Sequence, residues 1–156
     1  MAGFDYRTAP VSLKIAASAF LLLAVIGLGI AGLQIYVRTG MTPGGTLMHY
    51  RGDEATMQYP QSFGAMVDTA HAHAFTMPLL ALALSIAILL SKASETTKRV
   101  IVSALFAGMV LELGLPWLVR YGPAWTVHFF DLTGILLGGG LLVAAAIPLY
   151  EMWIAA

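Results

Sequence analysis

Hydrophobic residues form four long runs along the chain, separated by shorter polar segments. The runs cover about residues 15–37, 63–90, 100–119 and 125–150. An α-helix rises about 1.5 Å per residue, so roughly 20 apolar residues cross the hydrocarbon core of a bilayer. Each run is long enough for that, and the pattern therefore predicts four transmembrane helices.

Polar segments connect the runs, and only one of them is long. Residues 38–62 contain Pro, Gly and charged residues that rule out another spanning helix. Residues 91–99 and 120–124 are tight polar turns. Pro78, inside the second run, removes a backbone donor and is expected to kink its helix. We expect one all-α domain over residues 1–156, an integral membrane four-helix transmembrane bundle.

Composition agrees with this interpretation and limits the kinds of binding site that the chain can form. Hydrophobic residues make up 59% of the chain and charged residues only 10%, too few charges for a water-soluble surface. The net charge is zero, so the chain offers no basic surface for nucleic acid. It contains no cysteine, which excludes disulfides, thiolate zinc sites, iron–sulfur clusters and covalently attached haem. Any metal must therefore be held by His, Met or carboxylate side chains.

The distribution of Lys and Arg predicts the orientation of the bundle. Five of these residues fall on the side that carries both termini, and three fall on the other side. The first group is Arg7, Lys14, Lys92, Lys98 and Arg99, and the second is Arg38, Arg51 and Arg120. Cytoplasmic loops carry an excess of Lys and Arg. We therefore expect both termini in the cytoplasm, the long loop outside, and a location in a bacterial-type inner membrane.

Ionisable residues gather toward the predicted outer face, and all four histidines are among them. The group consists of His49, Asp68, His71, His73, Glu112, His128 and Asp131. Glu112 lies eight residues before Arg120 and thirteen after Arg99, which places it inside the hydrocarbon. A charge there costs a few kcal/mol, so such groups are usually paired and functional. We expect Glu112 to point into the bundle, either protonated or paired with a histidine, and to act as the catalytic group that takes or releases a proton.

The spacing of these residues assigns them to helix faces. Asp68 and His71 are three residues apart, as are His128 and Asp131, so each carboxylate can orient the neighbouring imidazole in a cofactor site. His71 and His73 point about 200° apart on a regular helix, so we expect them to have different roles. The alternative is that Asp68, His71 and His128 only solvate helix ends at the membrane interface.

One interpretation of the cluster is a single haem b near the outer face. Its axial ligands would be His71 or His73 on one helix and His128 on a facing helix, with Met77 as an alternative ligand. Glycines in the last run leave room for a flat macrocycle, although they equally suit close helix packing. The pattern resembles that of small four-helix membrane cytochromes b. In that family the histidines occupy both leaflets, so no assignment to it follows.

A second interpretation is a copper site. Five of the eight methionines lie in the stretch that also carries three of the four histidines: Met41, Met48, Met57, Met66 and Met77. Thioether and imidazole ligands suit copper, although Met also fills apolar contacts in many cores. His49 could close over the site from the loop or simply be exposed. The candidate metal ligands are His49, His71, His73, His128, Met66 and Met77.

These features favour a small membrane redox protein that holds one haem b or metal centre near the outer face. Its partners would be the lipid bilayer, quinol, and another membrane or extracytoplasmic redox protein. One alternative is an accessory or assembly subunit of a larger complex or oligomer, without a cofactor of its own. The other is copper binding or delivery. Hydrolase mechanisms have no support, because the sequence has no helical zinc-protease motif, Walker loop or G-x-S-x-G elbow.

Overall fold

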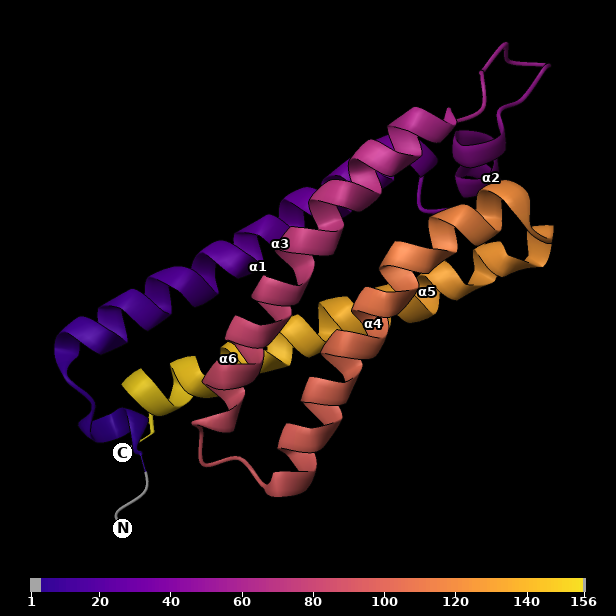
Figure 1. The fold of residues 1–156 in the computed structure, drawn as a ribbon. Coiled ribbons are helices and arrows are strands. Elements are labelled where there is room, and N and C mark those ends of the chain that lie inside the picture. The colour runs from indigo at the N-terminus through magenta and orange to yellow at the C-terminus, as the bar shows by residue number, and fades with distance from the viewer. Residues whose placement is uncertain (1–3, 156) are drawn as a thin grey trace.

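The structure, a computed structural model, describes residues 4–155 of the chain, and this part contains helices and no strands (Figure 1). The elements in order are η1 (Tyr6–Thr8), α1 (Val11–Thr39), α2 (Pro43–Arg51), α3 (Phe63–Leu89), α4 (Glu95–Tyr121), η2 (Ala124–His128), α5 (Phe129–Thr133), the π-helical segment η3 (Gly134–Gly139) and α6 (Gly140–Trp153). Four stretches are long and apolar enough to cross a membrane, namely α1, α3, α4 and Ala124–Trp153. The predicted all-α transmembrane fold is therefore confirmed.

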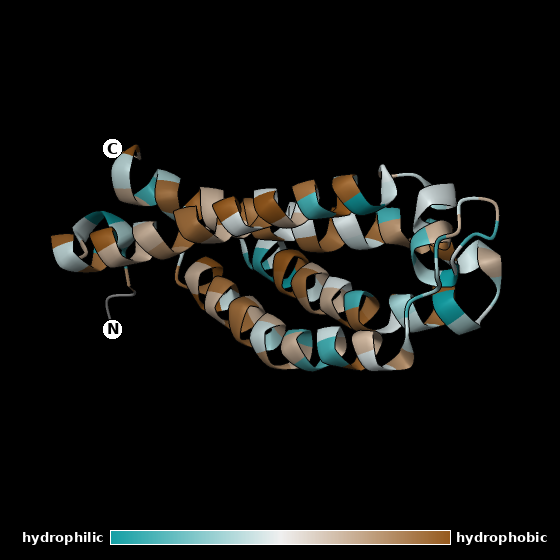
Figure 2. Ribbon diagram, turned by 90° about the horizontal axis from the view of Figure 1, so that it is seen from above, coloured by the Kyte–Doolittle hydropathy of each residue, from teal (hydrophilic) through white to brown (hydrophobic). Residues whose placement is uncertain are grey.

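Helix α4 extends beyond its apolar run because polar residues form its first turns, whereas α3 begins at Phe63, where its run begins. The third span begins at Glu95, five residues before the apolar run, and the Ser94 side chain caps it by accepting a hydrogen bond from the Thr97 backbone. Ser62 caps α3 in the same way through the Ala65 backbone. Hydropathy therefore located the hydrocarbon part of each span but not its polar ends, which Figure 2 shows in white and teal.

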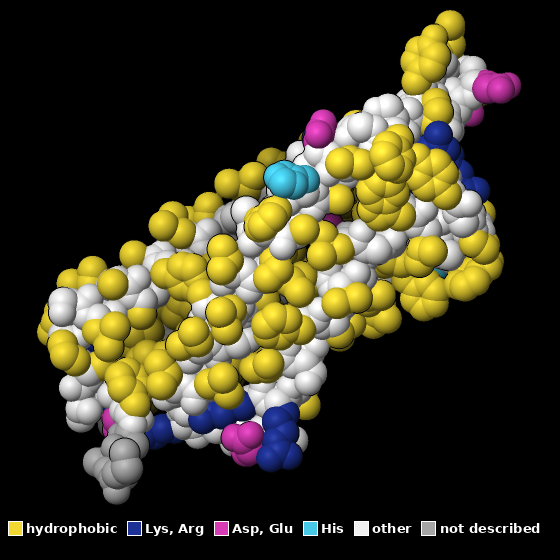
Figure 3. Space-filling model, viewed as in Figure 1, with side chains coloured by type: hydrophobic (Ala, Val, Ile, Leu, Met, Phe, Trp, Pro, Cys, Tyr) yellow, Lys and Arg dark blue, Asp and Glu magenta, His cyan; other side chains and the backbone are white. Residues whose placement is uncertain are grey.

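The antiparallel pair α3 and α4 forms the most extensive contact of the bundle. Helix α6 packs against both of them, while η3 and α5 pack against α4. Helix α1 lies at the periphery, against α6 and α2, and only Leu21 and Thr39 of its residues are buried. Hydrophobic side chains accordingly cover the outer surface of the bundle, as expected for a chain solvated by lipid (Figure 3).

Helix α4 and the π-helical segment η3 approach closely at Gly108. A β-carbon on Gly108 would lie 2.8 Å from the Leu137 backbone nitrogen and 2.9 Å from the Leu137 β-carbon. Only glycine fits against the neighbouring backbone at that distance. Prolines lie inside three of the helices, Pro78 in α3, Pro116 in α4 and Pro148 in α6, and Figure 1 shows α3 and α4 bending along their length.

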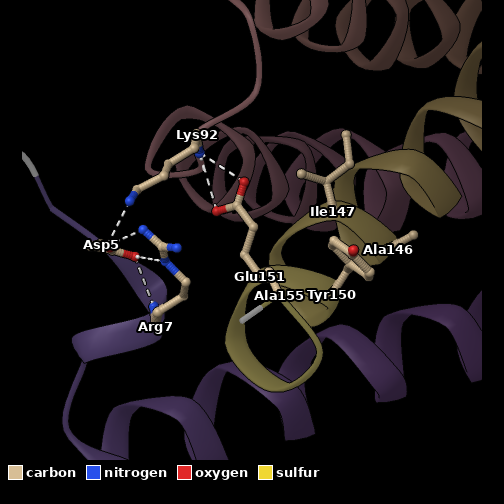
Figure 4. Close-up of a pocket in the computed structure, with 8 residues that line it drawn as sticks. All are labelled: Asp5, Arg7, Lys92, Ala146, Ile147, Tyr150, Glu151 and Ala155. Carbon is tan, nitrogen blue, oxygen red and sulfur yellow. Dashed lines mark hydrogen bonds and ion pairs between the residues drawn. The ribbon is translucent and has the colours of Figure 1, made fainter.

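Both ends of the described chain meet at one end of the bundle, called here the terminal end. Lys92, in the turn between α3 and α4, links the two ends of the chain (Figure 4). Its ammonium donates a hydrogen bond to the Asp5 carboxylate at 2.6 Å, and its backbone N–H donates one to the Glu151 carboxylate at 2.8 Å. Asp5 also accepts a hydrogen bond from Arg7, and hydrogen bonds from Arg7 and Lys92 hold the pKa of Asp5 well below its usual range. Tyr6 anchors the same segment by donating to the Ala87 carbonyl at 2.9 Å.

The opposite end, called the loop end, carries α2, an element that hydropathy alone does not indicate. Arg51 fixes α2 to the end of α4, because its guanidinium donates to the Val119 and Gly122 carbonyls at 2.6 Å each. Glycines with left-handed backbone conformations bracket the helix, Gly40 at φ 60° and Gly52 at φ 79°. These contacts hold α2 against α1, α4 and η2, over the loop end of the spans.

Removing the Arg51 guanidinium should destabilise the loop end. In Arg51→Met the Val119 and Gly122 carbonyls lose their donor, and we expect the free energy of unfolding to fall by about 1–3 kcal/mol. Thermal unfolding in detergent micelles measures the change. Arg99→Met is the matched control, since Arg99 pairs only with exposed Glu95 and its loss should have little effect. Equal stability of the two variants would contradict this role of Arg51.

Candidate functional site

His73 lies on the face of α3 that points into the bundle. The buried residues Ala81, Leu84 and Ile88 of α3 are three and four residues apart, and buried Met66 lies 15 residues before Ala81. His73 and Met77, both half-buried, continue this stripe at spacings of seven, four and four between Met66 and Ala81. An imidazole therefore replaces an apolar side chain at one level of the α3 core face.

Glu112 holds the corresponding position on α4. Its stripe contains buried Leu105, Met109, Leu115 and Val119, and Glu112 itself is half-buried. Because His73 lies 16 residues before Leu89 and Glu112 lies 17 residues after Glu95, both stand roughly 24–26 Å from the α3–α4 turn. The two side chains therefore stand at one level of the α3–α4 pair, near enough for an electrostatic interaction.

Tyr50 of α2 approaches the same level from the loop end. Its ring stacks on Phe130 of α5, with centroids 6.0 Å apart and an angle of 16° between the planes. Burial raises the pKa of Tyr50 to about 12; the nearby Glu112 carboxylate adds to this shift and Arg38 opposes it. Tyr50 therefore stays protonated at neutral pH and can donate a hydrogen bond. We call His73, Glu112 and Tyr50 the polar site.

His49 and Arg38 lie at the loop end of the polar site. The His49 ring packs against the Tyr50 ring, with centroids 5.0 Å apart. Burial lowers the pKa of His49, and the positive charge of Arg38 lowers it further, so His49 is a neutral imidazole at pH 7. The loop end thus supplies a neutral imidazole, a phenol and a guanidinium above the level of Glu112.

The polar groups at this level lack partners of their own. Within residues 4–155, neither Glu112 nor His73 forms a hydrogen bond or ion pair through its side chain. Pro116 has no N–H to donate to the Glu112 carbonyl four residues earlier, and Pro78 likewise leaves the Ala74 carbonyl without its helical donor. Unpaired polar groups in a low-dielectric interior are costly, so this level is suited to binding a charged or polar ligand.

The other predicted site residues lie outside the polar site. His71, two residues from His73, is exposed on the opposite face of α3 and contacts Phe75, with ring centroids 5.1 Å apart. His128 is exposed on η2. Asp68 and Asp131 are exposed as well, and among the described residues neither is hydrogen-bonded to the histidine three residues away.

The structure therefore gathers only part of the predicted ligand set. Met66 is buried on the α3 stripe but seven residues from His73, about 10 Å along the helix. Within the described part of the chain, no three His, Cys, Asp or Glu side chains form a group that could hold a metal ion. A metal between α3 and α4 would need thioether ligands beside His73. Tyr50 and Met109 were not among the predicted site residues, although Met109 shares a helix face with Glu112.

Comparison with known proteins adds one finding. A family model described as a transmembrane helical domain matches residues 40–156, which includes α2, α3, α4 and the fourth span but not α1. No curated protein and no solved structure matches the chain. The matched segment contains all three residues of the polar site. The chain is a member of the Aq_1264_TM family of transmembrane helical domains.

Proposed function

We propose that the protein is a small membrane redox protein that holds one metal or haem centre at the polar site. The centre would pass electrons between quinol and another membrane or extracytoplasmic redox protein. The observation that carries the proposal is that Glu112 and His73, both half-buried, lie at one level of two membrane-spanning helices, with no hydrogen bond or ion pair of their side chains among the described residues. A neutral imidazole is a common metal ligand, and a nearby carboxylate can take the proton that accompanies an electron.

A metal ion fits the positions of the predicted ligands better than a haem. Only His73 of the three candidate axial histidines points into the bundle, because His71 and His128 are exposed. Met77 lies one turn from His73 on the same face of the same helix, so the two cannot bind opposite faces of one macrocycle. Haem b would therefore need a second ligand from another chain, whereas a metal ion needs only neighbouring side chains.

The orientation predicted from Lys and Arg places the polar site near the outer surface. Arg7, Lys92 and Glu151 meet at the terminal end, which would face the cytoplasm of a bacterial-type inner membrane. The loop end, with Tyr50 and Arg38, would face the outside. Electrons and protons would then be exchanged at the outer leaflet.

Two other functions have specific support. The exposed side chains of Asp68, His71, His128 and Asp131 lie near the loop end and are unpaired within residues 4–155, and they could bind a neighbouring chain of a larger complex or oligomer. The chain would then be an accessory subunit. Alternatively, a copper ion held at the polar site could be cargo for delivery rather than a redox centre.

The first test is an absorption spectrum with elemental analysis of detergent-purified protein. We expect one metal ion or haem per chain, lost in His73→Ala because His73 is the inward-facing imidazole. His71→Ala is the matched control, since it removes an exposed imidazole two residues away. A colourless, metal-free protein, or equal loss in both variants, would rule out a centre at the polar site.

The second test concerns the proton. If Glu112, beside His73 and Tyr50, takes up a proton with each electron, the midpoint potential of the centre should fall by up to about 59 mV per pH unit. Glu112→Gln should flatten this dependence. Glu95→Gln, on the exposed first turn of the same helix, should leave it unchanged. A slope that survives in Glu112→Gln would show that another group carries the proton.

A further inference from the structure

Two methionines occupy the next level of the α3–α4 contact, one turn toward the terminal end from the polar site. Met77 follows His73 by four residues on α3, and Met109 precedes Glu112 by three residues on α4. These spacings place each methionine on the same helix face as its polar neighbour. Each helix therefore presents one thioether and one polar group to the space between them.

The register of the hairpin brings the two thioethers to a common height. Met77 lies 12 residues before Leu89 and Met109 lies 14 residues after Glu95, so both stand roughly 18–21 Å from the turn. Met109 is only 9% exposed, and Met77 packs against the buried core to which Met109 belongs. Methionine side chains are long and flexible, so both sulfur atoms can reach the His73 level.

Methionine commonly fills gaps in apolar cores, and that alternative has to be weighed here. The levels nearer the turn are built from aliphatic side chains, including Ala81, Leu84, Ile88 and Leu105. Two of the three inward-facing thioethers of α3 and α4, those of Met77 and Met109, thus occur one turn from the imidazole and the carboxylate, and the third, that of Met66, lies two turns nearer the loop end. A metal site requires thioethers next to the imidazole, whereas gap filling does not.

We propose that His73, Met77 and Met109 form a copper(I) site, with Glu112 beside it as the group that takes up the proton. This inference rests on the proposed function, since it names the metal and the ligands of that centre. One imidazole nitrogen and two thioether sulfurs make a soft, three-coordinate donor set. Glu112 is not one of the ligands, and no hard oxygen ligand is needed.

The donor set favours copper(I) over other ions. Thioether ligands select copper(I), whereas Mg²⁺, Ca²⁺ and Mn²⁺ prefer oxygen ligands and copper(II) prefers tetragonal nitrogen and oxygen donors. Copper(I) also carries only one positive charge into the low-dielectric interior, where a divalent ion costs more free energy.

Anaerobic titration of the full-length detergent-purified protein with Cu(I), in competition with bicinchoninate, tests the proposal. We expect one Cu(I) per chain, with affinity reduced by at least about tenfold in Met77→Leu and in Met109→Leu, and further in the double variant. Leu conserves the volume of Met, so the core should tolerate both changes. Met152→Leu, a buried methionine at the terminal end, is the matched control and should bind normally.

X-ray absorption at the copper edge of the loaded wild-type protein gives a readout that does not depend on the variants folding. Two sulfur scatterers and one nitrogen are expected, and only nitrogen and oxygen scatterers would overturn the assignment. A haem or another metal that is lost in His73→Ala but unaffected by the methionine variants would refute this inference and leave the proposed function standing. Absence of haem and of any bound metal, including added Cu(I), would refute both.

Discussion

The arrangement of the bundle depends on one constraint, that the carboxyl group of Glu112 lies on a membrane-spanning helix. Glu112 stands roughly 26 Å from the α3–α4 turn and has neither an ion pair nor a side-chain hydrogen bond within residues 4–155. The surrounding bundle supplies His73 at the same level and Tyr50 from the loop end. An ionisable group kept at this depth is best explained by a ligand that interacts with it.

The helices around Glu112 are irregular near its level. Pro116 follows it by one turn, Pro78 follows His73 by five residues on the facing helix, and the fourth span contains the π-helical segment η3. Such irregularities free backbone groups that regular helices would satisfy internally, and they are tolerated at membrane depth only where protein or a cavity surrounds them. The close packing of Gly108 on Leu137 closes the bundle four residues before Glu112, on the side of the α3–α4 turn.

The fold was predictable from sequence where hydrophobicity determines it. Hydropathy identifies spans of about 20 apolar residues directly. Helix α2 is short and polar, so its position depends on a tertiary contact, the hydrogen bond from Arg51 to the end of α4. For the site, helical spacing separated His71 from His73 but could not say which of them faces the bundle. Met109 was missed because it lies far from His73 and Met77 in sequence. It comes near their level only through the register of the α3–α4 hairpin.

Anomalous diffraction from crystals of the copper-loaded protein, collected at the copper edge, would locate the centre directly. The account predicts a single peak between α3 and α4, bounded by His73, Met77, Met109 and Glu112. A peak at the exposed His71 or His128, or no peak in a copper-loaded crystal, would contradict it.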